Sequence, residues 1–249
     1  NNEKAKNLFQ SWTKNMVLYG LDAGLGEFFM NASETSCLYQ LGNFIFPAGQ
    51  VDLDFWQDYS SQYGLADKII ISEDFSWREF LDSQSELQPF TRYAFSDKID
   101  FDAEALEKWQ SNLPAGFQLC PIEEDSYLAL AEEVWSQDLQ GDFVDFAHFQ
   151  VAGGFGFVLY LEEEVAAAVS TGLVYEKAIE IEIATKPVYQ RKGLAKVLGA
   201  RMILEAQKRS LIPLWDAHNV ASMKVAESLG YRFLGAYPAY ELKETFWKG

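Results

Sequence analysis

The chain has 249 residues, and 37 acidic against 20 basic side chains give it a formal net charge of −17 and a pI near 4.5. So acidic a surface repels phosphate backbones, which disfavours a general nucleic-acid-binding protein. Cys37 and Cys120 lie far apart and cannot form a disulfide framework or a zinc site of the CxxC kind, so we expect no bound metal. No run approaches about 18 apolar residues, and the first residues lack a signal peptide's apolar region, so we expect a cytoplasmic protein without a membrane segment.

The first part of the chain has the pattern of a mixed α/β domain. Apolar residues recur with helical spacing over Lys4–Leu18, and Cys37–Phe46 is rich in strand-forming residues before the turn at residues 47–49. Four aromatic residues then share one predicted helical face: Phe55, Trp56, Tyr59 and Tyr63. Because large aromatic side chains are mostly buried, this stripe indicates core, with a partner surface as the alternative.

A cluster of helix-breaking residues at Asn112–Gly116 (NLPAG) follows a helical stretch at Ala103–Trp109. We therefore predict a domain boundary, with a smaller N-terminal α/β domain at 1–112 and a second domain at 113–249. The strand-then-helix order of residues 69–84 returns at residues 213–229. This echo raises the hypothesis that the first domain is a degenerate copy of the second, although the pattern alone does not decide it.

The second part of the chain has a clearer order of elements. Its most regular stretch is EIEIAT, which alternates with the period of two that is typical of a strand. The predicted elements are a strand at Phe117–Ile122, a helix at Ser126–Leu139, strands at Gly154–Leu161, Val165–Tyr175 and Glu180–Thr185, a helix at Leu194–Arg209, a strand at Pro213–His218, a helix at Val220–Leu229 and a last strand region at Tyr231–Leu242.

The hexapeptide QRKGLA at residues 190–195 lies between a predicted strand and a long predicted helix. The unpaired N–H groups of a helix's first turn and its dipole favour an anion there, and a glycine at 193 lets the backbone approach a ligand closely. Three nearby cations suit a pyrophosphate or a 3′-phosphate: Arg191, Lys192 and Lys196. The motif is neither a Walker A loop nor the GxGxxG dinucleotide fingerprint.

The order strand, QRKGLA, long helix, strand, Asn219, helix, Gly230-Tyr231 resembles the GNAT superfamily of N-acetyltransferases over about residues 117–242. The resemblance implies a mixed, splayed sheet flanked by helices, with acetyl-CoA as co-substrate. In that family the loop cradles the pyrophosphate, the preceding strand lends backbone groups to the pantetheine arm, and the later Asn lies near that arm or caps its helix. By this resemblance the residues that bind acetyl-CoA are Ile183, Thr185, Gln190, Arg191, Lys192, Gly193, Leu194, Ala195, Lys196, Asn219 and Ser222.

Two features depart from ordinary members of that family. Many members have a tyrosine seven residues after the Asn, proposed to protonate the departing thiolate, and this chain has Ala226 there. The chain also carries an additional first half, and its segment Trp215–Asn219 (WDAHN) resembles a branch of two-part, GNAT-like bacterial proteins with a W-D-x-x-N signature. The missing tyrosine keeps open an alternative class, a non-catalytic acyl-CoA-binding protein with a regulatory or interaction role.

Glu180 and Glu182 alternate with isoleucines, so both carboxylates are expected on one face of their strand. An amine acceptor is protonated at neutral pH and must lose a proton before it attacks the thioester, and a carboxylate can accept that proton. Either residue is therefore a candidate catalytic base; the alternative is a solvated strand face, or pairing of the two carboxylates with Lys177 and Lys186. His218 is a second candidate base, because its ordinary pKa lies near neutrality, or it has a structural role.

The acceptor is predicted from the charge pattern. The segment from Trp109 to Glu176 has 12 carboxylates and no lysine or arginine, whereas residues 177–209 carry 8 basic residues. In a GNAT-like fold the first helices and neighbouring hairpins meet the acceptor, and a surface of one sign concentrates ligands of the other. We expect direct attack, in a ternary complex, by a small cationic amine or by a protein lysine or N-terminus; the alternative is that the acids only aid solubility.

Overall fold

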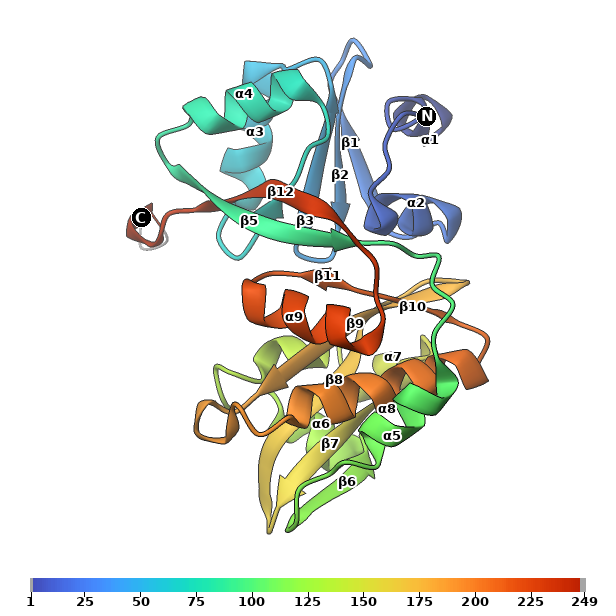
Figure 1. Ribbon diagram of the computed structural model, residues 1–249. Coiled ribbons are helices and arrows are strands. Elements are labelled where there is room, and N and C mark those ends of the chain that lie inside the picture. The colour runs from blue at the N-terminus through green and yellow to red at the C-terminus, as the bar shows by residue number, and fades with distance from the viewer. Residues whose placement is uncertain (1, 247–249) are drawn as a thin grey trace. The chain divides into compact units, whose positions relative to one another are not determined.

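A computed structural model describes residues 2–246, which form two compact units. Unit 1 runs to Arg92 and also includes the segment from Ala236 onward, and unit 2 is Tyr93–Gly235. Strands β5 (Leu87–Phe95) and β12 (Phe233–Leu242) each begin in one unit and end in the other. Mixed sheets flanked by helices confirm the predicted α/β class (Figure 1).

The border between the units differs from the predicted boundary after residue 112. Helix α5 (Ala103–Gln110) belongs to unit 2, where it packs against helix α8 (Leu194–Lys208). Leu106 of α5 is buried in the same core cluster as Leu198 of α8. Breaker residues mark a loop, but they do not show which core the preceding helix joins. The ranges 1–112 and 113–249, whose outermost residues lie outside the described part of the chain, stay a prediction as folding domains.

Unit 1 is built on a sheet in which β1, β2 and β3 form an antiparallel meander and β4 pairs with β3 in parallel. Strand β12 lies between β4 and β5 in this sheet. Trp56 and Trp77 bring two helices, α3 and α4, against one face of it, and Trp12 meets Phe46 on the other. The elements wholly within the unit are α1 (Asn2–Asn7), α2 (Asn15–Asp22), β1 (Glu27–Met30), β2 (Ser36–Leu41), β3 (Phe44–Gly49), α3 (Leu53–Tyr63), β4 (Ile69–Ile70), α4 (Phe75–Ser83) and a 3₁₀ turn at Glu244–Phe246.

The predicted helix over Lys4–Leu18 is wrong as a single element, because the chain forms α1 and α2 with turns between them. The carboxylate of Glu73 accepts hydrogen bonds from the N–H groups of Thr13, at 2.8 Å, and Lys14, at 3.1 Å. These bonds satisfy backbone donors at the start of α2. Glu73 is distant from α2 in the sequence, so the helical spacing of residues 4–18 could not reveal the break.

The predicted strand over Cys37–Phe46 is the hairpin β2–β3, which turns at Gly42 with a left-handed φ of 57°. Glycine adopts this conformation without the steric cost that a side chain brings. The aromatic stripe of α3 is core, as predicted, at Trp56 and Tyr59, which are 2% and 3% exposed. Tyr63, at the helix end, is 48% exposed.

Unit 2 contains a sheet with strand order β10-β9-β8-β7-β6, in which only the β9–β10 pair is parallel. No helix within residues 2–246 is long and apolar enough to cross a membrane. Besides α5 and α8, the elements wholly within the unit are β6 (Phe117–Pro121), α6 (Glu124–Ala129), 3₁₀ turn η1 (Gln137–Gln140), α7 (Phe146–Val151), β7 (Gly156–Leu161), β8 (Glu164–Val174), β9 (Ala178–Thr185), 3₁₀ turn η2 (Pro187–Tyr189), β10 (Ile212–Leu214), β11 (Asp216–Ala217) and α9 (Val220–Leu229).

Helices cover both faces of this sheet, with α5 and α8 on one side and α6 and α7 on the other (Figure 1). Ile179 and Ile181 of β9 are buried in one core cluster with Leu198 of α8. Ala184 of β9 packs on the opposite face against the cluster that contains Leu139 of η1. Strand β9 therefore presents alternate side chains to two different layers, as its sequence predicts.

The predicted helix over Ser126–Leu139 is wrong beyond its first turns, because α6 ends at Ala129 and a loop leads to η1. The hydroxyl of Ser136 donates to the carbonyl of Leu130 at 2.8 Å, and such a side-chain bond competes with helix formation. The predicted strand over Pro213–His218 is two short strands. Strand β10 pairs with β9, and β11 pairs with the end of β5 that belongs to unit 2.

Candidate active site

The sheet of unit 2 opens along one edge of β9. Strand β10 pairs in parallel with Ala178–Glu180 only, since the register ends at Glu180 and Leu214. After Leu214 the chain leaves β9, and β11 pairs with β5 instead. Among the described residues, 181–185 of β9 therefore have a strand partner only on the β8 side. The predicted splay of the sheet is present.

The backbone groups on the open edge belong to every second residue of β9. The N–H of Lys186 donates to β8, and the carbonyl of Lys177 accepts from the first residue of β10, so odd-numbered residues face away from β8. The residues whose N–H and C=O groups face the open edge are Ile181, Ile183 and Thr185. An extended chain with amide groups can add to such an edge as a further strand does.

Helix α8 begins just beyond this edge. Its N-cap is Gly193, with a left-handed φ of 79°, and none of the described side chains caps its first-turn N–H groups. A Cβ built at Gly193 would meet no atom of residues 2–246 within 4 Å, so the space there is open. Arg191, also left-handed with a φ of 65°, and Lys192 are both exposed beside it. Uncapped N–H groups, the helix dipole and two exposed cations fit the pyrophosphate of CoA.

Two other predicted loop residues make contacts within the protein. The Lys196 ammonium lies 3.1 Å from the centroid of the Trp109 ring, and desolvation lowers the pKa of Lys196. The side-chain amide of Gln190 donates to the carbonyl of Thr185 over a long 3.4 Å. Of the three predicted cations, Lys196 therefore packs on α5, whereas the other two are exposed at the loop.

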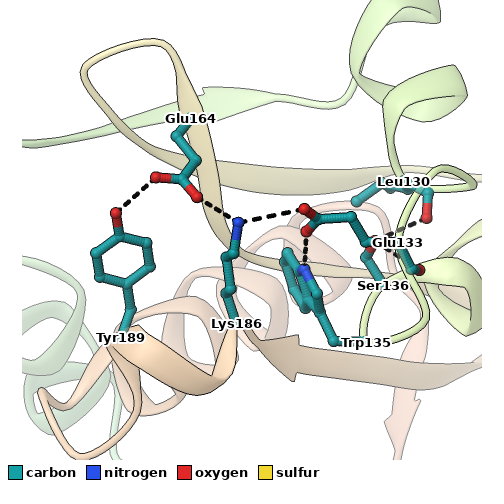
Figure 2. Close-up of polar contacts among 7 residues, drawn as sticks. All are labelled: Leu130, Glu133, Trp135, Ser136, Glu164, Lys186 and Tyr189. Atoms are coloured by element: carbon teal, nitrogen blue, oxygen red, sulfur yellow. Dashed lines mark hydrogen bonds and ion pairs between the residues drawn. The ribbon is translucent and has the colours of Figure 1, made fainter.

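A cluster of polar contacts holds the end of β9 that leads into the loop (Figure 2). The Lys186 ammonium forms ion pairs with Glu133, at 3.2 Å, and with Glu164, and the Tyr189 hydroxyl donates to Glu164 at 2.7 Å. The Trp135 indole N–H donates to Glu133. These bonds lower the pKa of Glu133, through Trp135 first, and of Glu164, through Lys186 first, and they raise the pKa of Lys186. Sequence reasoning missed the cluster, because its members come from separate segments.

The remaining predicted cofactor residues, Asn219 and Ser222, lie at the start of helix α9. Asn219 is its N-cap, with Oδ1 accepting from the N–H of Ser222 at 2.8 Å, so the helix-cap role left open by the sequence is present. The Ser222 hydroxyl accepts a hydrogen bond from the Trp215 indole at 3.2 Å. His218 is exposed, and its Nε2 lies 3.1 Å from the Asn219 side-chain nitrogen.

Glu180 and Glu182 project from one face of β9, opposite to the core face that holds Ile179 and Ile181. Glu180 is only 7% exposed, and its Oε1 accepts a hydrogen bond from the Tyr175 hydroxyl at 2.9 Å. Sequence reasoning did not select Tyr175. The short connection between β8 and β9, which brings their neighbouring ends together, is the signal that could have found it.

Glu182 lies against a bulge in β8. The pairing of β8 with β9 shifts between Thr171 and Leu173, so Gly172 is the additional residue. A Cβ at Gly172 would lie 2.6 Å from Cγ of Glu182, so the glycine leaves room for that side chain. Glu182 is half-buried, which makes it the more accessible of the two carboxylates.

Ala226, which stands where many GNAT-like proteins have tyrosine, is fully buried in the core of unit 2. A tyrosine side chain could enter this position only by displacing neighbouring core residues. Tyr231 is also buried, and its hydroxyl donates to the carbonyl of Pro213 at 2.6 Å. Burial, and secondly the charge of Glu180, raise the pKa of Tyr231, so its proton is strongly held.

Acidic, histidine and cysteine side chains are the usual metal ligands of proteins. Within residues 2–246, no group of three or more His, Cys, Asp or Glu residues could hold a metal ion. Both cysteines are free thiols, and desolvation raises the pKa of buried Cys37 to about 12. At neutral pH that thiol is protonated, so it is a weak nucleophile.

Comparisons with known proteins match this geometry. A family model described as GNAT acetyltransferase covers residues 6–240. The crystal structure of a GCN5-related N-acetyltransferase-like protein from Streptococcus suis superposes with a TM-score of 0.88 at 31% identity, over 97% of this chain and 98% of that chain. The ribosomal protein bS18-alanine N-acetyltransferase of Escherichia coli K12 is 37% identical over 78 residues, 30% of this chain and 53% of that protein.

A further relative is an uncharacterized N-acetyltransferase of Bacillus subtilis, 28% identical over 162 residues, which are 63% of this chain and 58% of that protein. The chain thus spans about half the length of the curated relatives that it matches. The family model and the Streptococcus suis structure, by contrast, match nearly all of this chain. The chain therefore belongs to the GNAT acetyltransferase family, whose members are acyltransferases that generally use acetyl-CoA as co-substrate.

Proposed function

We propose that the chain transfers the acetyl group of acetyl-CoA to an amine by direct attack in a ternary complex. The observation that carries the proposal is the unpaired edge of β9 that leads to the uncapped start of α8. An edge strand that can pair with amide groups, followed by a site for a pyrophosphate, fits the two halves of a CoA molecule. Family membership supports the same reaction class.

In this proposal the N–H groups of residues 191–195 hold the pyrophosphate, with Arg191 and Lys192 adding charge. Ile183 and Thr185 offer backbone groups to the pantetheine arm along the open edge. Asn219 acts chiefly as the N-cap of α9, since its Oδ1 accepts the cap hydrogen bond of that helix. The bound thioester supplies an activated acetyl group, and the protein's own groups orient it and manage the acceptor's proton.

Glu182 is the proposed general base, with Glu180 as the alternative. An ammonium acceptor must transfer one proton before its nitrogen can attack, and a carboxylate within hydrogen-bond reach, or one water away, can accept it. Half-buried Glu182 lies in the space left by Gly172, whereas Glu180 is almost fully buried and bound to Tyr175. Accessibility therefore favours Glu182.

The departing thiolate is proposed to leave without a tyrosine acid at position 226. A thiol ionises at a pKa of about 8.5, so its thiolate is a fair leaving group near neutral pH. Ala226 is a packed core residue rather than a truncated site residue. The absence of an acid there nevertheless favours a second candidate function, acyl-CoA binding without turnover. Amine-dependent release of the CoA thiol distinguishes the two functions.

The acceptor is proposed to be cationic. All 12 carboxylates between Trp109 and Glu176 are exposed, and Glu133 and Glu164 form ion pairs with Lys186. The exposed acids around α6, η1 and α7 thus give this segment a strong negative potential. Because the Escherichia coli relative is named for acetylating an alanine of a ribosomal protein, peptides with a free N-terminus belong in the panel beside small polyamines.

This acceptor preference predicts a salt dependence. Raising the ionic strength from about 0.01 to 0.15 M shortens the Debye length from about 30 to 8 Å, so the kcat/KM for a polyamine should fall steeply. The kcat/KM for an uncharged amine analogue should stay nearly constant, which provides the matched control. Steady-state kinetics at constant pH measures both. Equal salt responses of the two acceptors, or a preference for anionic ones, would leave the acids with a solubility role only.

A further inference from the structure

Unit 1 repeats the order of elements found in unit 2. In each unit short helices precede three antiparallel strands, and these are followed by a helix, a strand parallel to the third strand, and another helix. Unit 2 has one further antiparallel strand, β6, before its short helices. The helices after the third strand share one core in both units: Trp56 of α3 and Trp77 of α4 are in ring contact, and Leu198 of α8 and Leu229 of α9 belong to one buried cluster. Strand β3 therefore corresponds to β9, and β4 corresponds to β10.

The hydrogen bonds give the correspondence residue by residue. The carbonyl of Asn43 accepts from the first residue of β4, as that of Lys177 accepts from the first residue of β10. Ile45 is therefore equivalent to Ile179, and both are buried on the face covered by the following helix. Continuing in steps of two, the residues of β3 equivalent to Ile181 and Ile183 are Pro47 and Gly49.

The edge that is open in unit 2 is occupied by the chain's own groups in unit 1. Pro47 has no N–H, and its carbonyl accepts a hydrogen bond from the fully buried Ser72 hydroxyl at 2.7 Å. The N–H of Gly49 donates to the carboxylate of Asp74 at 2.7 Å, and the other oxygen of that carboxylate accepts from the Trp12 indole at 3.2 Å. Asp74 is the N-cap residue of α4, as Asn219 is of α9. The Pro47 carbonyl and the Gly49 N–H are therefore already bonded and are not offered to a pantetheine arm.

The start of α3 is likewise closed to an anion. Its N-cap is Asp52, whose carboxylate accepts from the N–H of Phe55 at 3.0 Å and from the Asn31 amide at 2.9 Å. The Asn31 bond, followed by the Phe55 bond, lowers the pKa of Asp52, so the carboxylate is charged at neutral pH. Only residues 50 and 51 separate Gly49 from this cap, whereas residues 184–192 separate the equivalent strand residue from Gly193. A negative cap and a short connection replace the pyrophosphate loop.

We infer that unit 1 is a second copy of the GNAT fold whose cofactor groove is filled by its own side chains, so that the chain binds one CoA, in unit 2. Ser72 and Asp74 take the positions along the strand edge, and Asp52 takes that of the pyrophosphate. The role of unit 1 is then not acetyl transfer. The inference goes beyond the proposed function, because it assigns the first half of the chain a duplicated origin and an inactive groove.

Counting bound CoA on the full-length chain tests this inference. Native mass spectrometry with excess CoA should show one CoA per chain for the wild type, none for Gly193→Asp, and one for Asp74→Ala. Hydrogen–deuterium exchange with and without CoA provides a second readout that does not depend on any variant. Protection should appear in peptides covering residues 181–197 and be absent from those covering 45–56 and 69–76.

Two CoA molecules per chain, or CoA-dependent protection of residues 45–56 or 69–76, would each overturn the inference. The Asp74→Ala variant should also lower the unfolding temperature, because it leaves the Gly49 N–H and the Trp12 indole without their acceptor. A wild-type chain that binds no CoA would contradict the proposed function while agreeing with a closed groove in unit 1, so the two failures are distinguishable.

Discussion

Replacing Gly193 by aspartate is expected to abolish acetyl-CoA binding while the chain stays folded. The residue is an exposed N-cap with open space around its Cβ position, so a new side chain meets no core. Its carboxylate would cap the first-turn N–H groups and place a negative charge where the pyrophosphate is proposed to lie. We expect a loss in affinity of about 100-fold or more by isothermal titration calorimetry.

Gly193→Asn is the matched control for this prediction. Asparagine has nearly the shape of aspartate and adopts the left-handed conformation at a similar cost, so the two variants share the strain that the φ of 79° imposes. They differ in charge alone, and the asparagine variant should bind at least about 10-fold more tightly than the aspartate variant. Unchanged affinity in Gly193→Asp would show that the pyrophosphate does not lie at the start of α8.

Replacing Glu182 by glutamine is expected to lower kcat by roughly 10²–10⁴-fold, the usual contribution of a positioned general base. The amide keeps the size of the side chain beside Gly172 but cannot accept the acceptor's proton. Affinity for acetyl-CoA should stay the same, because the cofactor's backbone partners are untouched. Steady-state kinetics combined with calorimetry separates the two effects.

Glu180→Gln is the control on the same face of the strand. Its amide oxygen can still accept the Tyr175 hydrogen bond, so the local packing is kept and a small change in kcat is expected. A large loss in Glu180→Gln with none in Glu182→Gln would transfer the role of base to Glu180. Full activity in both single variants and in the double variant would show that neither carboxylate removes the proton.

The sequence predicted best those elements that local periodicity determines. The alternation of EIEIAT marked β9, and Val220–Leu229 matches α9 to the residue, because Asn219 and Gly230 provide recognisable caps. The loop before α8 was found for the same reason, since a glycine between a strand and a helix is a local signal. The open edge beside it is the consequence of β10 ending at Leu214.

The features that the sequence did not predict depend on distant residues. The break between α1 and α2 involves Glu73, which lies 60 residues from the Thr13 N–H that it binds. The Lys186 cluster joins a strand end to a hairpin and to the loop after α6. Each of these contacts forms only when the chain has folded, so no window of sequence contains the information.

The proposed duplication is an intermediate case. The strand-then-helix echo between the two halves was visible, but it could not separate a repeat from coincidence. The decisive observations are the parallel pairs β3–β4 and β9–β10, which are tertiary. Once these pairs are aligned, the side chains of Ser72 and Asp74 are found on the edge that corresponds to the open one in unit 2.

Release of free CoA thiol from acetyl-CoA, followed in the presence of a panel of amines, is the direct test of acetyl transfer by this chain. We expect release that depends on both the enzyme and the amine, that is fastest with cationic acceptors, and that is lost in Gly193→Asp. We also expect one acetylated amine for each thiol released. Acetyl-CoA binding with no amine-dependent thiol release for any small amine or peptide N-terminus would contradict catalysis and assign the chain to acyl-CoA binding alone.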